Sequence, residues 1–317
     1  MKTKSWKKLM VAVRDFDRSS QKLLNKAAAL AQRFGSTLEV VHVSSNAIEA
    51  FNIPGLLSAP NSSNEIAKIQ LQRLEKMVRP LFKMGIAIQC SSVFDHPPAD
   101  GIVRQVLKHN PDLLIIQSQR HGEAARIFLS NTDWELIRNC PCPLWIVKKP
   151  RLKPSLSVLA AIDPFHEHAK PANLDNEILN AAGRSVGTGA GRFGLCHAYT
   201  TPQSVVTALG EAALIPATPA EARRYKKQVI DTTGRVSKQY AIARKDQLVI
   251  EGDPADSIPA IAKRWKADLL VMGAVSRRGL KRIFIGNTAE RVLDAVNCDL
   301  LVIKPRDFKC PVPRKAP

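Results

Sequence analysis

Aromatic residues make up only 5% of the 317-residue sequence, so few side chains could stack on the bases of a single-stranded nucleic acid. No apolar run reaches the roughly 18 residues that a membrane helix needs. The segment from Met1 to Lys8 leads directly into a strand-like run and not into a signal-peptide core. Six cysteines without regular spacing are typical of thiols in a reducing compartment and predict no disulfide framework. We therefore expect a soluble cytoplasmic protein that has no membrane partner.

Acidic residues are also scarce, because 28 Asp and Glu stand against 47 Lys and Arg, for a net charge of +19. Residues 1–150 hold 21 basic and 12 acidic residues, and residues 151–317 hold 26 and 16. An excess spread this evenly is typical of general surface character and not of a docking stripe. Nucleic-acid binding is one hypothesis that follows from the charge, but we do not expect it to be specific.

An internal repeat organises the chain. Residues 112–116 match 268–272, and residues 126–132 match 282–288, both at an offset of 156. Near the start of each copy the offset falls to 148, which predicts about eight extra residues in the second copy, expected within Thr200–Pro219. A Pro-rich and cationic linker covers residues 148–154. The repeat predicts two tandem domains, 1–150 and 151–317.

Short aliphatic runs alternate with helical patterns in each copy. In the first copy we predict strands near 8–14, 37–43, 86–93, 112–117 and 143–148, and helices near 19–34, 64–84, 99–109 and 131–139. The runs lack polar alternation, as parallel strands do when helices cover both faces. The fold class is therefore α/β, with two tandem doubly wound parallel sheets whose ligand sites lie beyond the carboxyl ends of the strands. Helix caps are predicted at Ser19, Asn131 and Asn287.

Polar residues follow the first two predicted strands of each copy. Asp15 and Asp163 come directly after the first strand, where a carboxylate could bind an adenine amino group, a hydroxyl or a metal, or could cap the next turn. His42 and His197 hold matching places near the end of the second strand. Each ring could border a ligand or could serve only as a satisfied polar group.

The segment from Gly273 to Thr288 contains the parts of a phosphate cradle. A glycine at a strand exit allows close approach of a ligand, and Gly286 before a helix start leaves backbone N–H groups free for an anion. Basic residues within the loop, such as Arg277, add positive potential beside it. Walker A spacing and Gly-x-Gly-x-x-Gly are both absent, which argues against P-loop and dinucleotide sites.

The strand-end Asp, the turn at Glu251–Pro254 and the loop that ends Gly286-Asn-Thr resemble the universal stress protein family. Residues 5–305 are similar to its tandem, E-type bacterial members. The resemblance implies a stress-response protein whose second domain binds ATP or AMP, with Mg²⁺. The resemblance assigns Asp163, Gly252, Gly273, Gly286, Asn287 and Thr288 to the nucleotide. The predicted site also includes the strand-end His197 and the loop residues Ser276 and Arg277.

The sequence departs from the family pattern in both copies. Ser276 and Asn287 replace a glycine and a Ser/Thr of the family loop, so we expect weaker or altered binding in the second domain. The first copy has no glycine at the three loop positions and has His96 at the expected place of Gly252. We expect a degenerate first domain that is a structural partner or holds a different ligand. Its equivalent positions are Asp15, His42, Gln117, Arg120, Ser130, Asn131 and Thr132.

The sequence gives little support for a metal site or a catalytic site. Cys140-Pro-Cys142 and the pair His166 and His168 lack companion ligands at zinc spacing, so no metal site is predicted. No catalytic nucleophile or dedicated base is visible, and at most slow ATP hydrolysis is expected. A second class of function stays open, in which the two copies form an intramolecular pseudo-dimer that docks protein partners without nucleotide. Homodimer formation through sheet edges stays open as well.

Overall fold

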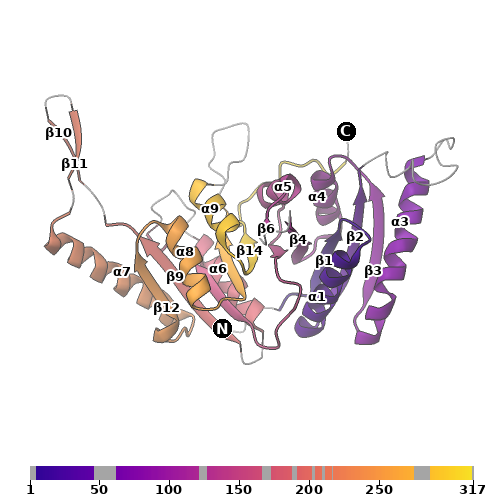
Figure 1. Cartoon of the computed structure of the whole chain (residues 1–317), viewed down its shortest axis with the longest axis horizontal. Helices are drawn as coiled ribbons and strands as arrows, with labels where there is room; N and C mark the ends of the chain where they lie inside the picture. Colours follow the sequence, from indigo (N-terminus) through magenta and orange to yellow (C-terminus); the bar gives the residue numbers. More distant parts are fainter. Residues whose placement is uncertain are drawn as a thin grey trace.

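The computed structural model describes residues 5–45, 62–120, 127–165, 173–187, 191–201, 204–208, 211–215, 217–274 and 286–315. These residues form one ten-stranded sheet with helices on both faces (Figure 1). The N-terminal half contributes strands β1 (Lys8–Val13), β2 (Thr37–Ser44), β3 (Ile88–Phe94), β4 (Leu113–Gln117) and β7 (Leu144–Val147). Its helices are α1 (Arg18–Phe34), α3 (Ser62–Val78), the 3-10 helix η2 (Arg79–Met84), α4 (Pro98–His109) and α5 (Asn131–Asn139).

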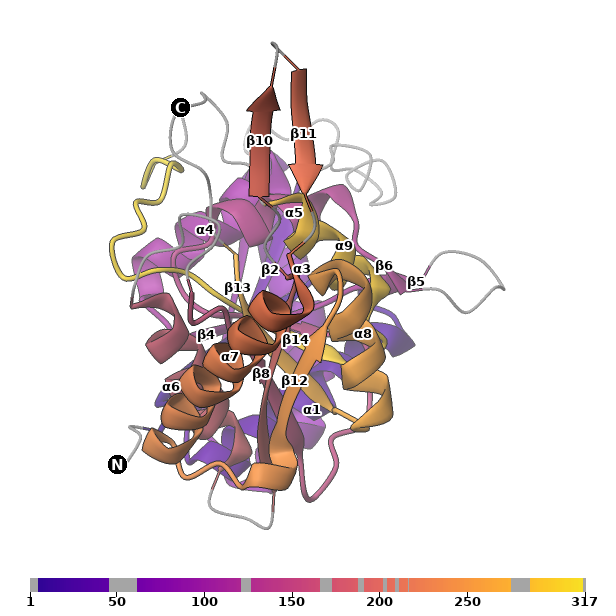
Figure 2. The same cartoon turned by 90° about the vertical axis from the view of Figure 1, so that its left-hand side faces the viewer.

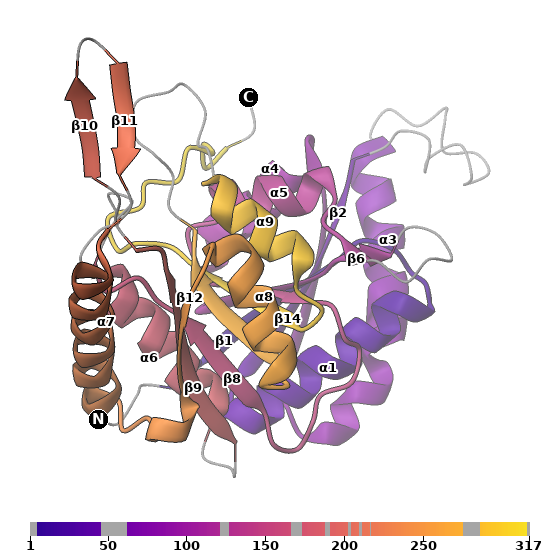
Figure 3. The same ribbon diagram turned by 60° about the vertical axis from the view of Figure 1, so that its left-hand side comes forward.

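The C-terminal half repeats this element order. Its strands in the main sheet are β8 (Ser157–Ala161), β9 (Arg192–Tyr199), β12 (Gln247–Glu251), β13 (Leu269–Gly273) and β14 (Asp299–Ile303). Its helices are α6 (Leu174–Val186), α7 (Pro219–Gln239), η3 (Arg244–Asp246), α8 (Pro254–Arg264) and α9 (Asn287–Ala295). Two small hairpins lie outside the main sheet, β5 (Gln119–Arg120) with β6 (Ile127–Phe128), and β10 (Ser204–Ala208) with β11 (Glu211–Ile215). Figure 3 shows β10 and β11 standing away from the sheet.

The strand order confirms two tandem doubly wound parallel sheets. The first half runs β3-β2-β1-β4-β7 and the second β12-β9-β8-β13-β14, with parallel pairing inside each half. The halves join where β7 pairs antiparallel with β14, through Leu144 with Val302, Trp145 with Leu301, and Ile146 with Leu300. A shift of 156 residues exchanges the outer two pairs, so the junction has the symmetry of a dimer interface. The two copies therefore form an intramolecular pseudo-dimer.

Two apolar cores lie on opposite faces of the sheet and run through both halves. Along β1, Leu9, Val11 and Val13 belong to the first core, whereas Met10 and Ala12 belong to the second, as the twofold alternation of a strand requires. Helices α1, α3 and α6 cover the first core, and helices α4, α5, α8 and α9 cover the second. In Figure 2, α6 and α7 lie on one side of β12 and α8 lies on the other.

Buried polar groups tie the halves together beside β7 and β14. The carboxylate of Asp299 accepts hydrogen bonds from Lys26 Nζ and, at 2.8 Å, from Trp145 Nε1. It also accepts the backbone N–H groups of Lys148 and Lys149, each at 3.0 Å. The Lys148 ammonium donates to the backbone carbonyls at the end of α9. Each half therefore satisfies buried groups of the other.

The predicted elements hold, but the three predicted helix caps are wrong. Asp17, and not Ser19, caps α1 by accepting the backbone N–H of Ser20 at 2.8 Å. Ser130 caps α5 where Asn131 was expected, and Gly286 holds the cap position of α9 where Asn287 was expected. Each helix begins one or two residues earlier than the sequence suggested, because several adjacent polar residues are equally good caps in isolation.

The predicted place of the extra residues is also wrong. Thr37 lies 29 positions after its partner Lys8, whereas Arg192 lies 35 positions after Ser157. Most of the insertion therefore lies between β8 and β9, and the stretch Thr200–Pro219 contains the β10–β11 hairpin instead. Residues 148–156 connect β7 to β8, and the boundary at residue 150 stays a prediction.

Candidate functional site

Backbone contacts at the strand ends establish which positions of the two halves correspond. His42 Nδ1 lies 2.9 Å from the carbonyl oxygen of Val13, and His197 Nδ1 lies 3.0 Å from that of Ile162. The next residues, Arg14 and Asp163, are therefore equivalent. The predicted pairing of Asp15 with Asp163 was wrong by one residue, because matching the two aspartates hides the register of the sheet.

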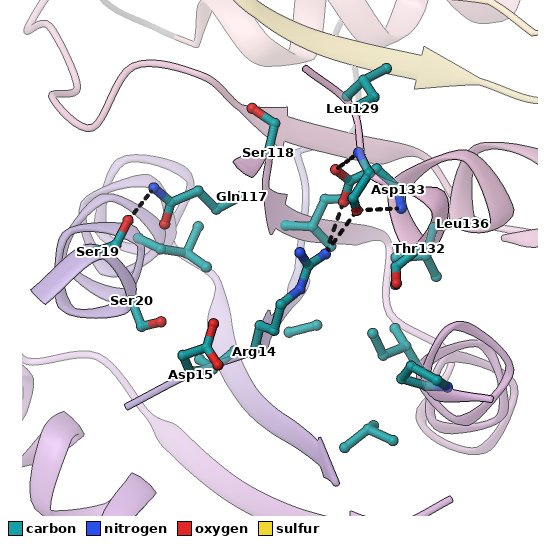
Figure 4. A pocket seen from close by; sticks show the side chains of 18 of the residues that line it. Arg14, Asp15, Ser19, Ser20, Gln117, Ser118, Leu129, Thr132, Asp133 and Leu136 are labelled. Carbon is teal, nitrogen blue, oxygen red and sulfur yellow. Dashed lines mark hydrogen bonds and ion pairs between the residues drawn. The ribbon is translucent and has the colours of Figure 1, made fainter. Parts of the chain in front are cut away.

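A cavity of about 960 Å³ opens beyond the carboxyl ends of β1 and β4 in the N-terminal half (Figure 4). Of the residues predicted for this half, its wall contains Asp15, Gln117, Ser130, Asn131 and Thr132. Gln117 Nε2 donates a hydrogen bond to Ser19 Oγ at 2.8 Å. The buried ring of His42 is not among the residues that line the cavity, and the side chain of Arg120, which belongs to β5, lies outside the described part of the structure.

Side chains of the protein itself fill the end of this cavity beside the N-terminus of α5. Arg14 reaches across it and lies 3.2 Å from both Asp133 Oδ1 and Ser130 Oγ (Figure 4). Asp133 is fully buried and accepts the backbone N–H of Ser130 at 2.8 Å, while Ser130 Oγ accepts the N–H of Asp133. This capping box satisfies the backbone N–H groups of Ser130 and Asp133, and it places a carboxylate at the helix N-terminus, where an anion would otherwise bind.

Asp133 thus places its carboxylate at the N-terminus of α5. Burial raises the pKa of this carboxyl, while the hydrogen bonds from Ser130 and the Arg14 guanidinium act in the opposite direction. The sequence analysis missed both Arg14 and Asp133. The spacing of Ser130 and Asp133 is that of a capping box, so it was the available signal for the second of them.

The equivalent helix of the C-terminal half begins without such a cap. Gly286 stands at the cap position, no hydrogen bond from a described side chain closes it, and a Cβ there would meet nothing within 4 Å among the described residues. Asn287 and Thr288 form an exposed first turn, and Ala289 holds the place of Asp133. The first backbone N–H groups of α9 have no acceptor within the helix, so they are available to an anion.

Two buried acceptors lie at the ends of the neighbouring strands of this half. The Oδ1 atom of Asp163 is buried and has no hydrogen-bond partner among the described residues, and the same holds for Nε2 of His197. Since Nδ1 of His197 faces a carbonyl oxygen, we assign the ring proton to Nδ1, which makes Nε2 an acceptor. His42 differs, because its Nε2 lies 3.1 Å from Ser44 Oγ.

Aromatic rings lie beside these acceptors. The His197 ring lies 5.9 Å from Phe165 and stacks with Tyr199 at 6.3 Å between centroids. Tyr225 of α7 lies 6.0 Å from Phe165 and 5.8 Å from Tyr199. This edge of the C-terminal half therefore combines unpaired acceptors, aromatic faces and a free helix N-terminus.

The two predicted glycines of this edge have visible structural roles. Gly252 has a φ of 148°, and a Cβ there would lie 2.7 Å from Ser257 Oγ, so the position requires glycine. A Cβ at Gly273 would lie 2.7 Å from Leu174 Cδ2, so its absence makes room for α6. Contact of these glycines with a ligand stays a prediction, and Ser276 and Arg277 lie outside the described residues.

The predicted counterpart of Gly252 was wrong. Gly252 donates its backbone N–H to Tyr199, and the matching bond in the first half runs from Asp95, and not His96, to Ser44. The Asp95 carboxylate pairs with Arg104 through two hydrogen bonds of 2.6 and 2.5 Å. The first half has one additional residue between β3 and α4. Matching the halves at the single offset of 156 therefore pairs Gly252 with His96 instead of Asp95.

Two further properties concern the described residues as a whole, namely clusters of metal-ligating side chains and membrane-spanning helices. Within the described ranges no group of three or more His, Cys, Asp or Glu side chains is placed to hold a metal ion. No helix in that part of the chain is both long and apolar enough to cross a membrane. His166 and His168 lie outside those ranges.

Comparison with known proteins shows which protein family the sequence matches. A model of the universal stress protein family matches residues 5–148 and 191–304. Universal stress protein E of Escherichia coli K12 is 28% identical over 312 residues, which cover 96% of each chain. A solved structure from Pseudomonas aeruginosa PAO1 matches with a TM-score of 0.73 at 20% identity, covering 96% of this chain and 95% of that one. A universal stress protein of Archaeoglobus fulgidus matches with a TM-score of 0.63 at 16% identity, covering 96% and 100%. The two structural matches show the same fold.

Proposed function

The chain belongs to the universal stress protein family, and on that premise we propose that its C-terminal half binds an adenine nucleotide, ATP or AMP, or a related phosphorylated ligand. One observation carries the proposal. The uncapped N-terminus of α9 lies at the same sheet edge as the unpartnered Oδ1 of Asp163. A nucleotide has the matching chemistry, since it combines a phosphate acceptor with amino donors on its base.

Each part of the edge has a role in this proposal. Backbone N–H groups of Asn287 and Thr288 hold the phosphate, where the helix dipole contributes about 1 kcal/mol. The base donates its amino group to Asp163 Oδ1 or His197 Nε2, both of which lack a described partner. Phe165 and Tyr199 cover the face of the base. With ATP, Mg²⁺ would be bound by phosphate oxygens and water.

The N-terminal half does not share this function in our proposal. The N-terminus of α5 already holds the buried Asp133 carboxylate, which repels a phosphate at that place. Arg14 also stands where Asp163 offers an acceptor in the other half. We therefore expect one nucleotide per chain. The residual cavity of about 960 Å³ fits a ligand that carries no phosphate at α5.

Calorimetric titration of the full chain with ATP and AMP tests the proposal. We expect one site per chain. The double variant Gly286→Ser/Ala289→Asp rebuilds the capping box of α5 on α9, and we expect it to weaken binding at least tenfold, or about 1.4 kcal/mol. Arg14→Gln in the other half is the matched control and leaves the affinity unchanged.

Two outcomes would refute nucleotide binding. One is the absence of heat with either nucleotide at millimolar concentration. The other is equal affinity of the wild-type chain and a folded Gly286→Ser/Ala289→Asp variant. Unchanged stress protection by that variant would instead favour the alternative, an interaction protein that acts through its pseudo-dimer. All six cysteines are unpaired in the structure, which supports our further proposal of a reducing, cytoplasmic location.

A further inference from the structure

Two thiols meet at the end of α5, away from the ligand-binding edge. Cys140 Sγ and Cys142 Sγ lie 3.6 Å apart. Cys140 ends the helix and is almost fully buried, whereas Cys142 is partly exposed just before β7. A third thiol, Cys310, donates to the backbone carbonyl of Asn139 at 3.3 Å. The Cys140-x-Cys142 motif therefore places two sulfur atoms within contact distance.

The charge environment of Cys140 differs from that of the other thiols. Hydrogen bonding from Cys142 lowers the pKa of Cys140 against the opposing effect of burial, and the Lys304 ammonium lowers it further. Burial raises the pKa of Cys196 and of Cys298 to about 12 and that of Cys90 to about 11. Of the six thiols, Cys140 alone has both a neighbouring sulfur and a lowered pKa, and a lowered pKa increases the fraction of a thiol that is present as thiolate.

Lys304 comes from the other half of the molecule. It directly follows β14 and is buried, and its charge acts on Cys140 across the junction of the pseudo-dimer. The C-terminal half has no matching dithiol, since the repeat places Val296 and Cys298 at the corresponding positions. Cys298 is thus a natural control with one thiol and no partner.

We propose that Cys140 and Cys142 form a redox-active dithiol that hydrogen peroxide converts to an intramolecular disulfide. The Cys140 thiolate attacks one peroxide oxygen, the O–O bond breaks, and the leaving hydroxide takes a proton to become water. The Cys142 sulfur then attacks the sulfenic sulfur of Cys140, the S–O bond breaks, and the Cys142 proton leaves with the hydroxide as a second water. The two thiols lose two electrons in total, and one peroxide molecule is reduced to two water molecules.

Peptide mapping of the full chain tests the proposal. The protein is treated with hydrogen peroxide, its remaining thiols are alkylated, and it is digested with trypsin. Cleavage after Arg138 and Lys148 releases both cysteines in one peptide, while Cys310 begins another. We expect the 139–148 peptide to escape alkylation and to lack two hydrogens, and Cys298 to be alkylated. Full alkylation of 139–148 under conditions that oxidise Cys298, or a cross-link of either cysteine to Cys310, would overturn the proposal.

Variants separate the roles of the two thiols and the lysine. Cys142→Ser prevents the disulfide and leaves a sulfenic acid on Cys140, which dimedone traps. Lys304→Met slows disulfide formation about fivefold near neutral pH and moves the pH midpoint of Cys140 alkylation upward, whereas Lys304→Arg restores both. Cys298→Ser is the matched control and changes neither. Absence of trapped Cys140 in folded Cys142→Ser, or an unchanged rate in folded Lys304→Met, would contradict the assigned roles.

Discussion

Helix α5 begins at a serine that caps it, whereas α9, its equivalent in the second half, begins at a glycine and has no described cap. Three positions after the cap position, the first helix carries the buried Asp133 and the second carries Ala289. At the end of the first strand, the first half carries the cationic Arg14 and the second half carries the anionic Asp163. The halves therefore share a backbone and place opposite charges at the same edge.

In our proposal, this difference removes the anion site from the first copy and leaves its fold unchanged. In the N-terminal half, the Asp133 carboxylate accepts the backbone N–H of Ser130 at the start of α5, and the Arg14 guanidinium pairs with that carboxylate. The start of α5 therefore resembles a helix N-terminus with a bound anion, because the Asp133 carboxylate lies there. In the C-terminal half the same donors face the solvent edge. The variants below test which residues cause this difference between the halves, in order of decreasing expected change in stability.

Asp299 has no acidic counterpart in the other half, because the repeat places Pro143 at the equivalent position. A substitution of Asp299 therefore tests an asymmetry at the junction. Asp299→Ala leaves the buried Lys26 without its carboxylate, and we expect a loss of about 4 kcal/mol in the free energy of unfolding. Urea denaturation measures this loss. Removing both charges in Lys26→Met/Asp299→Leu should recover much of it. A loss below about 1 kcal/mol in Asp299→Ala would show that the pair does not stabilise the junction.

Asp133 tests the internal anion of the N-terminal half. Asp133→Ala removes the capping box and the partner of Arg14, and we expect a loss of about 3 kcal/mol in the urea-derived free energy of unfolding. The variant should also bind inorganic phosphate at α5, as calorimetry would detect. The control is Ala289→Gly at the matching position of α9, where no such bonds exist to be lost. An unchanged stability in Asp133→Ala would refute the capping role.

The two strand-end histidines offer a matched pair. His42→Leu should destabilise the fold by about 2 kcal/mol, because it removes contacts to both Val13 and Ser44. His197→Leu should cost about half as much, because His197 makes one described hydrogen-bond contact, to Ile162, where His42 makes two, but it should weaken nucleotide binding. Thermal unfolding and calorimetry measure the two effects. Equal destabilisation together with unchanged affinity would remove His197 from the proposed site.

Lys148 tests a feature that the halves share, because burial lowers the pKa of both Lys148 and Lys304 to about 8. An unfolded lysine holds its proton to about pH 10.4, so between pH 8 and that value the unfolded chain binds more protons and stability rises with pH. Compared with Lys148→Met, the wild type should gain about 1 kcal/mol between pH 7 and pH 9. Lys149→Met, at the exposed neighbour, is the control. A difference that stays constant with pH would contradict the lowered pKa.

Sequence reasoning succeeded where local pattern determines structure. Aliphatic runs predicted the strands of both halves, and the repeat predicted their tandem arrangement, because burial on two faces demands continuous apolar residues. The predicted helix over 64–84 instead divides into α3 and η2 near Pro80, whose ring nitrogen carries no hydrogen to donate. The hairpin β10–β11 was not predicted, since its stretch had been interpreted as a polar insertion.

The candidate site was predicted less completely for a specific reason. Asp163, His197 and Gly286 were recognisable from their order along the chain, although their contact with a ligand stays a prediction. Arg14 and Asp133 were missed, because their roles depend on a contact between residues 119 positions apart. The register error of one residue at Asp15 had the same origin, since side-chain identity was matched without the hydrogen bonds that define strand pairing.

The sequence by itself thus determined the α/β class and the duplication, because periodicity and repeats record burial directly. Only the tertiary structure decided that the halves join through β7 and β14, that Asp133 occupies the anion position of the first half, and that Cys140 faces both Cys142 and a lysine of the other half. The pairing of β7 with β14, the contact of Arg14 with Asp133 and the effect of Lys304 on Cys140 depend on distances between residues far apart in the chain. Such distances are a consequence of packing, and no local pattern of residues encodes them.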